Sequence, residues 1–259
     1  MDAISNLPEQ SIISLSIDPD GALTAQRATL LASIIGTLVN RSTAIPSLEL
    51  HDVSLTRDAP ELIRAINSTR ATSIRMERCR WTQQAVTELD FSAVTDLALD
   101  VSSGGLSPGS GGQLARELVR KAAPTLRRLF LSPDFGEPDW IGNQDLHMPC
   151  LEHVILHQTA LSALSSLSAP RLLVIQVEYG TQFHAYTAFG HQVDVRQTGL
   201  RARLLHSALE TGNLARVRLV EFRQFAHISR AEFCSATAVL QELCVARGIR
   251  LLHDSETVV

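Results

Sequence analysis

The sequence predicts an α/β fold in which short parallel strands form the concave face of an irregular solenoid and helices cover its convex face. Two observations predict this fold. A short apolar pattern recurs along the chain, and segments with helical spacing lie between several of its copies. Parallel strands need such crossovers, because consecutive strands run in the same direction. The chain has 259 residues, of which 45% are hydrophobic, so it can bury a sizeable core.

The recurring pattern is a leucine-like residue, two variable positions, and then an apolar-x-apolar pair. In a strand, alternate side chains face opposite sides, so the apolar pair points into the core and the residue between them points outward. The segments that carry the pattern are SIISLSI (11–17), which is the weakest, PSLEL (46–50), ATSIRM (71–76), VTDLAL (94–99), TLRRLFL (125–131), CLEHVIL (150–156), RLLVIQV (171–177), RVRLV (216–220) and GIRLL (248–252).

The first apolar residue of each pair defines the spacing of the copies. These residues are Leu15, Leu48, Ile74, Leu97, Leu129, Val154, Ile175, Val217 and Ile249, and the steps between them are 33, 26, 23, 32, 25, 21, 42 and 32 residues. Leucine-rich repeats usually run about 20–29 residues, so the array is leucine-rich-repeat-like with insertions. We expect a single domain over residues 1–259, with the insertions near 101–112 and 178–213.

Four segments between the strands are predicted helices. They are ALTAQRATLLASIIGTLVNR (22–41), PELIRAINS (60–68), GGQLARELVRKAA (111–123) and ISRAEFCSATAVLQELCVARG (228–248). The second starts with Pro60, which suits a first helical turn, and the third stops at Pro124. The fourth has Ser229 as an N-cap with Glu232 three residues on, and it ends at Gly248.

Two segments interrupt the array. VSSGGLSPGSGG (101–112) is rich in glycine and serine, which predicts a mobile loop. The second interruption begins with the aromatic stretch YGTQFHAYTAFGHQ (179–192) and continues with LRARLLHSALE (200–210), which has the pattern of an amphipathic helix. We expect the aromatic stretch either to cover the concave face or to act as a binding loop.

The sequence holds no motif for catalysis, a cofactor or a metal. The densest set of metal-ligand residue types is HMPCLEHVILH, with His147, Cys150, His153 and His157. On a strand, His153 and His157 share one face but lie about 13 Å apart, so they cannot bind one zinc ion. GLSPGSGGQ (105–113) lacks the G-K-[ST] ending of a phosphate-binding loop, and no G-x-S-x-G motif occurs. We therefore predict no catalytic residue, no metal site and no cofactor, and a protein that is not an enzyme.

Composition and charge exclude several further classes. The net charge of −4 gives no global attraction to nucleic acid or to anionic membranes. A signal peptide and an apolar run of about 18 residues are both absent from the sequence, so we expect no membrane span. The four cysteines are scattered without a CxxC pair, and Cys234 and Cys244 would lie about 15 Å apart along one predicted helix. These features favour a cytoplasmic or nuclear protein with free thiols.

Basic residues are almost all arginine, since Lys121 is the only lysine among 23. A GC-rich genome is the simplest explanation. The functional alternative is that few lysines limit ubiquitination of the chain itself.

Alternation along the strands predicts which residues reach the concave face, where solenoids usually bind their partners. These residues are Glu49, His51, Arg75, Glu77, Asp96, Asp100, Phe130, His153, Ile155, His157, Gln176, Glu178, Arg216, Arg218 and Arg250. Phe130 and Ile155 are apolar where a solvated face would carry polar groups, so they are candidate anchors for a partner. The predicted partner-binding set is Phe130, Ile155, His153, His157, Gln176, Glu178, Arg216 and Arg218. Cover by a loop or helix is the alternative explanation for Phe130 and Ile155.

The segments TLRRLFL, MPCLEHVIL and LQELCVARGIRLL (240–252) resemble the repeat domain of F-box proteins from mushroom-forming fungi. The resemblance spans most of residues 45–252. It implies a leucine-rich-repeat domain that recruits a substrate to a cullin-type ubiquitin ligase. The F-box itself is not recognisable, because SIISLSIDPDG, which follows Asn6-Leu7-Pro8-Glu9, already has the pattern of a strand and turn.

These observations predict a monomeric protein-protein interaction module, and the resemblance implies substrate recognition for an F-box-type ubiquitin ligase. The expected partner is a protein of unknown identity, with a cullin-ligase adaptor as the specific candidate, and neither nucleic acid nor a membrane is expected. Two alternatives stay open. One is a hydrolase-like enzyme with a degenerate α/β fold, and the other is a non-functional receptor fragment.

Overall fold

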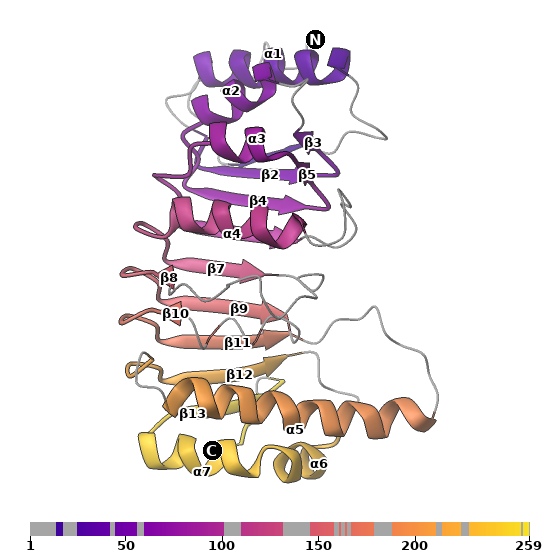
Figure 1. Cartoon of the computed structure of the whole chain (residues 1–259), viewed down its shortest axis with the longest axis vertical. Coiled ribbons are helices and arrows are strands. Elements are labelled where there is room, and N and C mark those ends of the chain that lie inside the picture. Colours follow the sequence, from indigo (N-terminus) through magenta and orange to yellow (C-terminus); the bar gives the residue numbers. More distant parts are fainter. Residues whose placement is uncertain are drawn as a thin grey trace. The chain divides into compact units, whose positions relative to one another are not determined.

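The computed structural model describes residues 14–17, 25–41, 45–55, 60–100, 110–131, 146–157, 161, 164, 167–178, 188–210, 214–223, 228–254 and 256–258 (Figure 1). The chain divides into two compact units, an N-terminal unit of residues 1–126 and a C-terminal unit of residues 127–259. Both combine helices with parallel strands, which confirms the predicted α/β class. That residues 1–259 form a single domain stays a prediction.

The N-terminal unit alternates strands and helices. Its elements are β1 (Ser14–Ile17), α1 (Ala25–Arg41), β2 (Ser47–His51), β3 (Ser54–Leu55), α2 (Pro60–Ser68), β4 (Ser73–Glu77), β5 (Arg80–Trp81), α3 (Gln83–Glu88), β6 (Asp96–Asp100) and α4 (Ser110–Ala122). The main sheet has the order β1-β2-β4-β6 with every pairing parallel, and β3 and β5 form a second, two-stranded sheet. In Figure 1, α2, α3 and α4 lie along one side of these strands.

The register of this sheet follows the predicted positions. Leu15 aligns with Leu48, Leu48 with Ile74, and Ile74 with Leu97. The residues three positions before Leu48, Ile74 and Leu97 are also buried; they are Ile45, Ala71 and Val94. The face that bears these apolar pairs is the core face, and the opposite face is called the outer face below.

Main-chain hydrogen bonds hold each turn on the previous one just before the strand begins. The carbonyl of Pro46 accepts from the N–H groups of Thr72 and Ser73, both at 3.0 Å. The carbonyl of Thr72 accepts in the same way from Thr95 at 2.8 Å and Asp96 at 3.0 Å. The register is therefore set by the preceding turn.

The chain repeats a second feature where β2 and β4 end. Asp52 and Arg78 both have positive φ, 53° and 50°, and their N–H groups donate to Glu77 and Asp100 on the next strand, both at 3.0 Å. This bend redirects the chain into β3 and β5. Residues 45–55 and 71–81 are two eleven-residue stretches that bury the same positions, the first, fourth, sixth, ninth and eleventh. The last two of these positions are Val53 and Leu55 in the first stretch.

The C-terminal unit continues with parallel strands. Its elements are β7 (Arg128–Leu131), β8 (Leu146–His147), β9 (His153–His157), β10 (Leu167–Ser168), β11 (Val174–Glu178), α5 (Ala188–Glu210), β12 (Leu219–Arg223), α6 (Arg230–Ala236), α7 (Ala238–Arg247), β13 (Arg250–His253) and β14 (Glu256–Thr257). The main sheet has the order β7-β9-β11-β12-β13-β14, and β14 alone in it pairs antiparallel. β8 and β10 pair in parallel as a separate short sheet.

The predicted positions hold in β7, β9 and β11 but not in β12 and β13. Leu129 aligns with Val154 and Val154 with Ile175, as expected. Ile175, however, aligns with Val220, and Val220 aligns with Leu251. Val217 instead fills the buried position three residues before the strand pair, equivalent to Leu172.

The physical reason for this shift is the larger side chain that it buries. The core-facing pair of β12 is Val220 and Phe222, both with no exposed surface. The Phe222 ring meets the ring of Phe233 on α6 edge-on, with centroids 5.1 Å apart. The prediction that Arg216 and Arg218 lie on the outer face of a strand is therefore wrong, because both precede β12.

The helices agree with the sequence in most of their bounds. α2 matches residues 60–68, and α4 ends before Pro124, but α4 begins at Ser110, so residues 110–112 are helical and do not belong to a loop. Residues 101–109 and 179–187 lie outside the described residues, and α5 is longer than predicted because it begins at Ala188.

The helix predicted over residues 228–248 is two helices. It breaks at Thr237, whose hydroxyl donates to the carbonyl of Phe233 at 2.8 Å. The predicted ends are confirmed: Ser229 and Glu232 form a capping box, and Gly248 ends α7 with φ 64°. Cys234 and Cys244 consequently lie on different helices, and all four cysteines are free.

Candidate functional site

The outer face of the N-terminal unit carries the charged residues predicted for it. Alternation in β2, β4 and β6 buries the leucine, isoleucine and methionine pairs and leaves the residues between them partly or fully exposed. The register places Glu49 beside Arg75 and His51 beside Glu77. Asp100 follows Glu77 in the same row on β6.

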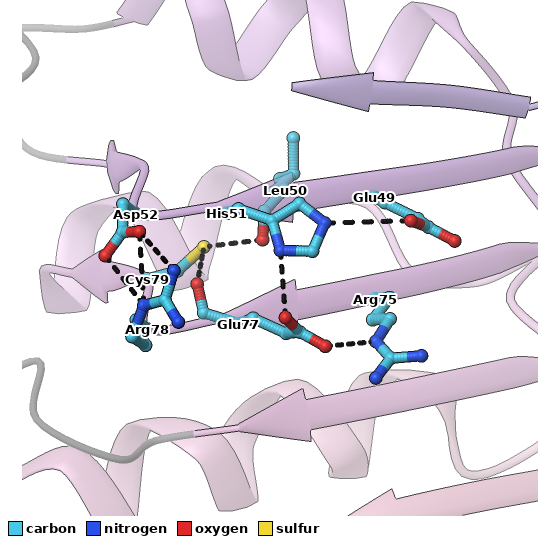
Figure 2. Close-up of polar contacts among 8 residues, drawn as sticks. All are labelled: Glu49, Leu50, His51, Asp52, Arg75, Glu77, Arg78 and Cys79. Carbon is cyan, nitrogen blue, oxygen red and sulfur yellow. Dashed lines mark hydrogen bonds and ion pairs between the residues drawn. The ribbon is translucent and has the colours of Figure 1, made fainter. Parts of the chain in front are cut away.

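These neighbours form a chain of ion pairs, shown in Figure 2. Nδ1 of His51 lies 2.9 Å from Oε2 of Glu77, and its Nε2 lies 3.6 Å from Oε2 of Glu49. Nε of Arg75 donates to the other oxygen of Glu77. The imidazole of His51 thus lies between two carboxylates. Three carboxylates of this patch face one arginine and one histidine, so acidic groups predominate.

A second pair lies at the carboxyl end of the same strands. Two nitrogens of Arg78 donate hydrogen bonds to the carboxylate of Asp52, Nη2 at 2.6 Å and Nε at 3.0 Å (Figure 2). The hydrogen bond from Arg78 lowers the pKa of Asp52 below 3.8. This two-nitrogen contact joins the positive-φ residues of two consecutive turns, so it supports the stacking of those turns.

Cys79, drawn beside this pair in Figure 2, is buried, and its thiol donates to the carbonyl of Leu50 on the preceding turn at 3.2 Å. Burial raises its pKa to about 12. A thiol that stays protonated is a poor nucleophile and a poor metal ligand. Cys79 is thus a structural hydrogen-bond donor.

The outer face of the C-terminal unit has a different character. Phe130 on β7 aligns with Ile155 on β9, so two apolar side chains lie side by side, and both are only partly buried. The same row continues through Gln176 and Glu221. These two polar residues are 2% and 4% exposed, so this row is less accessible in the middle than at Phe130 and Ile155.

Hydrogen bonds and ion pairs join four polar residues of this face, whereas the buried Nε2 of His153 has no hydrogen-bond partner among the described residues. Gln176 donates to Glu178 at 2.9 Å, and Nε of Arg223 lies 2.9 Å from Glu221. Burial lowers the pKa of His153 below 6.5, and the charges of two arginines lower it further, while a hydrogen bond with Gln176 opposes them. His153 is therefore neutral at physiological pH.

The structure brings together six of the eight residues in the predicted partner-binding set. Phe130, His153, Ile155, His157, Gln176 and Glu178 all lie on β7, β9 and β11. Arg216 and Arg218 do not join them, and Glu221 and Arg223 occupy the corresponding positions of β12. Phe222 is the signal that could have identified Glu221 and Arg223. A large apolar side chain favours the core side of the strand, which places the two flanking residues on the outer face.

The cluster of histidines and Cys150 does not form a metal site within the described residues, where no three His, Cys, Asp or Glu side chains are arranged to hold an ion. His147 instead lies 3.2 Å from the hydroxyl of Ser168. Within the same part of the chain, every helix is too short or too polar to cross a membrane. Comparison of the chain with models of known families, with curated proteins and with solved structures finds no match.

Proposed function

We propose that this chain is a protein-protein interaction module that binds its partner through the outer face of its strands. The observation that carries the proposal is the apolar pair of Phe130 and Ile155, which lies partly exposed on that face. Solvated sheet faces favour polar residues, whereas binding hot spots combine apolar anchors with a polar surround. Arg128, which is exposed, and His153 supply that surround in the neighbouring row.

We propose further that both units are turns of one leucine-rich-repeat-like solenoid, with the sheet on the concave side and the helices on the convex side. The eleven-residue stretches 45–55 and 71–81 support this, because both bury the apolar positions of the pattern L-x-x-L-x-L-x-x-N/C-x-L, although the first has Val53 at the N/C position. Cys79 stands at the N/C position and donates to a carbonyl of the preceding turn. In such solenoids the strands line the concave surface that binds partners.

The specific form of the proposal is substrate recognition for a ubiquitin ligase of the F-box type, as a monomer in the cytoplasm or nucleus. Its support is the sequence resemblance of residues 45–252 to repeat domains of fungal F-box proteins. The four free cysteines fit a reducing compartment.

The test is quantitative affinity capture from the source cells, read by mass spectrometry, with wild-type chain and two variants. Phe130→Asp and Ile155→Asp each place an unpaired charge on the apolar pair, and each should lower capture of the partner about tenfold or more. Val245→Asp is the matched control, since Val245 is 66% exposed on α7.

Circular dichroism melts establish that all three variants fold. Partner capture that is equal for wild type and both outer-face variants would refute the proposed surface. Recovery of a cullin adaptor with the wild-type chain would support the ligase role, and its absence from an otherwise specific complex would contradict that role.

A further inference from the structure

Four arginines and one leucine lie where strands β11, β12 and β13 begin in the C-terminal unit. They are Arg171, Leu173, Arg216, Arg218 and Arg250, here called the arginine rim, and all five are exposed. Leu173 is 43% exposed. The rim stands at the strand starts and does not include Phe130 and Ile155, although Arg250 lies in the row that runs through Arg128 and His153.

Main-chain hydrogen bonds place the rim residues next to one another. The carbonyl of Leu173 accepts from the N–H of Arg218 at 2.9 Å, and the carbonyl of Arg218 accepts from the N–H of Arg250 at 2.9 Å. Leu173 and Arg218 directly precede the aligned residues Val174 and Leu219, so they lie side by side about 4.8 Å apart. Arg250 aligns with Leu219 and therefore stands one residue further along the next turn. Arg171 and Arg216 stand two residues before Leu173 and Arg218 in equivalent turns.

The rim differs from the other charged surfaces in the balance of its charges. Within the part of the chain that the structure describes, none of its four arginines makes an ion pair or a side-chain hydrogen bond. The outer face of the same unit, by contrast, pairs Arg223 with Glu221. The four guanidinium groups form a positive strip on a chain whose net charge is −4, and Glu152 borders it on the preceding turn, where its main-chain carbonyl accepts from the N–H of Leu173.

We propose that the arginine rim binds an acidic segment of a partner protein, with an apolar side chain of that segment packed on Leu173. Guanidinium groups bind carboxylates through two parallel hydrogen bonds, so a row of Asp and Glu side chains matches a row of arginines. An apolar side chain within the acidic segment would cover the exposed surface of Leu173. A nucleic acid fits less well, because the rim has no aromatic side chain on which a base can stack.

The test uses a fluorescein-labelled synthetic peptide of alternating Asp and Glu with one central Leu, titrated by fluorescence anisotropy. Three comparison probes are the same peptide with Leu replaced by Ser, its Asn and Gln analogue, and a single-stranded oligonucleotide of equal charge. The acidic peptide should bind, and the neutral analogue should not. Affinity should fall as salt rises toward about 0.15 M, since exposed charges are screened.

A matched pair of double variants separates the rim from general charge. Arg218→Glu/Arg250→Glu removes two rim arginines, whereas Arg196→Glu/Arg203→Glu changes the net charge equally on α5 of the same unit, where both residues are exposed. The rim variant should weaken peptide binding about tenfold or more, and the α5 variant less than about twofold. Leu173→Ser should weaken binding of the leucine peptide but not of the serine peptide.

Three outcomes would overturn the proposal: no measurable binding of the acidic peptide, equal losses in the two double variants, or tighter binding of the oligonucleotide than of the peptide. Circular dichroism melts confirm that each variant is folded. Because the probe is synthetic, this proposal can fail while capture through the outer face succeeds, and the reverse also holds.

Discussion

Replacing Lys121, the only lysine of the chain, should destabilise the N-terminal unit far more than replacing its neighbour. The ammonium group of Lys121 donates to the carbonyls of Val86, Thr87 and Leu89 at 2.6, 2.6 and 2.7 Å. An ammonium has three donors, and all three are used. These carbonyls lie at the end of α3, where backbone acceptors lack partners within the helix.

The size of the effect follows from those contacts. Lys121→Met keeps an unbranched stem and removes the three donors. A hydrogen bond to a charged group contributes roughly 1.5–3 kcal/mol, but the site is only partly buried, so water can replace part of each bond. We expect the free energy of unfolding to fall by about 2–3 kcal/mol in total. This figure includes the small favourable interaction between the ammonium and the C-terminal end of α3. Burial lowers the pKa of Lys121 below 10.5, yet the carboxylates of Glu117 and Asp90 oppose this, and the ammonium persists at neutral pH.

The assay is urea unfolding at neutral pH, with Arg120→Met as the control. Arg120 adjoins Lys121 on α4, but its side chain is 65% exposed and its partner is Glu117 in an exposed i,i+3 pair. That pair should contribute less than about 0.5 kcal/mol. Equal losses in the two variants would refute the reasoning.

Amine chemistry gives an independent reading of the same contacts. A succinimidyl ester should label Lys121 slowly in the folded chain and quickly in urea, because acylation needs a free amine. Equal labelling rates in the two states would contradict the hydrogen-bonded amine. An amine held by three carbonyls also makes a poor acceptor for ubiquitin unless α3 opens.

Three further predictions concern titration, thiol reactivity and backbone strain. Burial lowers the pKa of His153, so as pH falls through 6.5 the unfolded chain takes up the proton first and the free energy of unfolding falls. In urea titrations His153→Gln should therefore lose less stability than the wild type between about pH 7 and about pH 5. An unchanged slope of stability against pH would contradict this. Iodoacetamide should modify the partly buried Cys150 faster than Cys79, whose pKa is about 12, with peptide mass spectrometry as the readout and equal rates as the contrary result. Gly248→Ala should cost about 1 kcal/mol because φ is +64°, whereas Gly36→Ala inside α1 should stabilise by roughly 0.5–1 kcal/mol, and melts in which both changes act in the same direction would speak against the assigned backbone strain.

The strand positions were predictable wherever only one phase of alternation buries large side chains. Leu48, Ile74 and Leu97 each stand in a segment with one such phase, and they align as expected. The run from Val217 to Phe222 offers two phases, and packing of Phe222 against α6 selects the second. A contact with a helix that begins at Arg230 is not visible in a local pattern.

The helix break at Thr237 was missed for a similar reason. Apolar spacing continues through residues 228–248, so the pattern predicts one helix, whereas a hydroxyl-to-carbonyl hydrogen bond at a buried threonine accompanies the change of direction. The short strands β3 and β5 were also missed, because two residues are too few for alternation to be seen. The buried Cys79 two residues before Trp81 was the available signal.

Part of the candidate site was predictable because outward positions follow directly from inward ones. The six residues on β7, β9 and β11 were placed in this way. Alternation predicts which side of the sheet a residue faces, but not how much of its side chain is exposed. The burial of Gln176 and Glu221 could therefore not be predicted from the sequence. Three arginines of the rim, Arg216, Arg218 and Arg250, were among the residues predicted for the concave face, but Leu173 was not.

The main-chain bonds that hold each strand on the preceding turn separate the alignment of the strands from the length of chain between them. Ile74 and Leu97 are 23 residues apart and Ile175 and Val220 are 45 apart, yet each of these strand pairs aligns five residues. Crossover length is therefore a free variable in this architecture. A foreign peptide or a whole helix grafted between β11 and β12 should be displayed without shifting a single residue of the sheet. The same freedom lets such a chain acquire new binding elements by insertion while its framework stays unchanged.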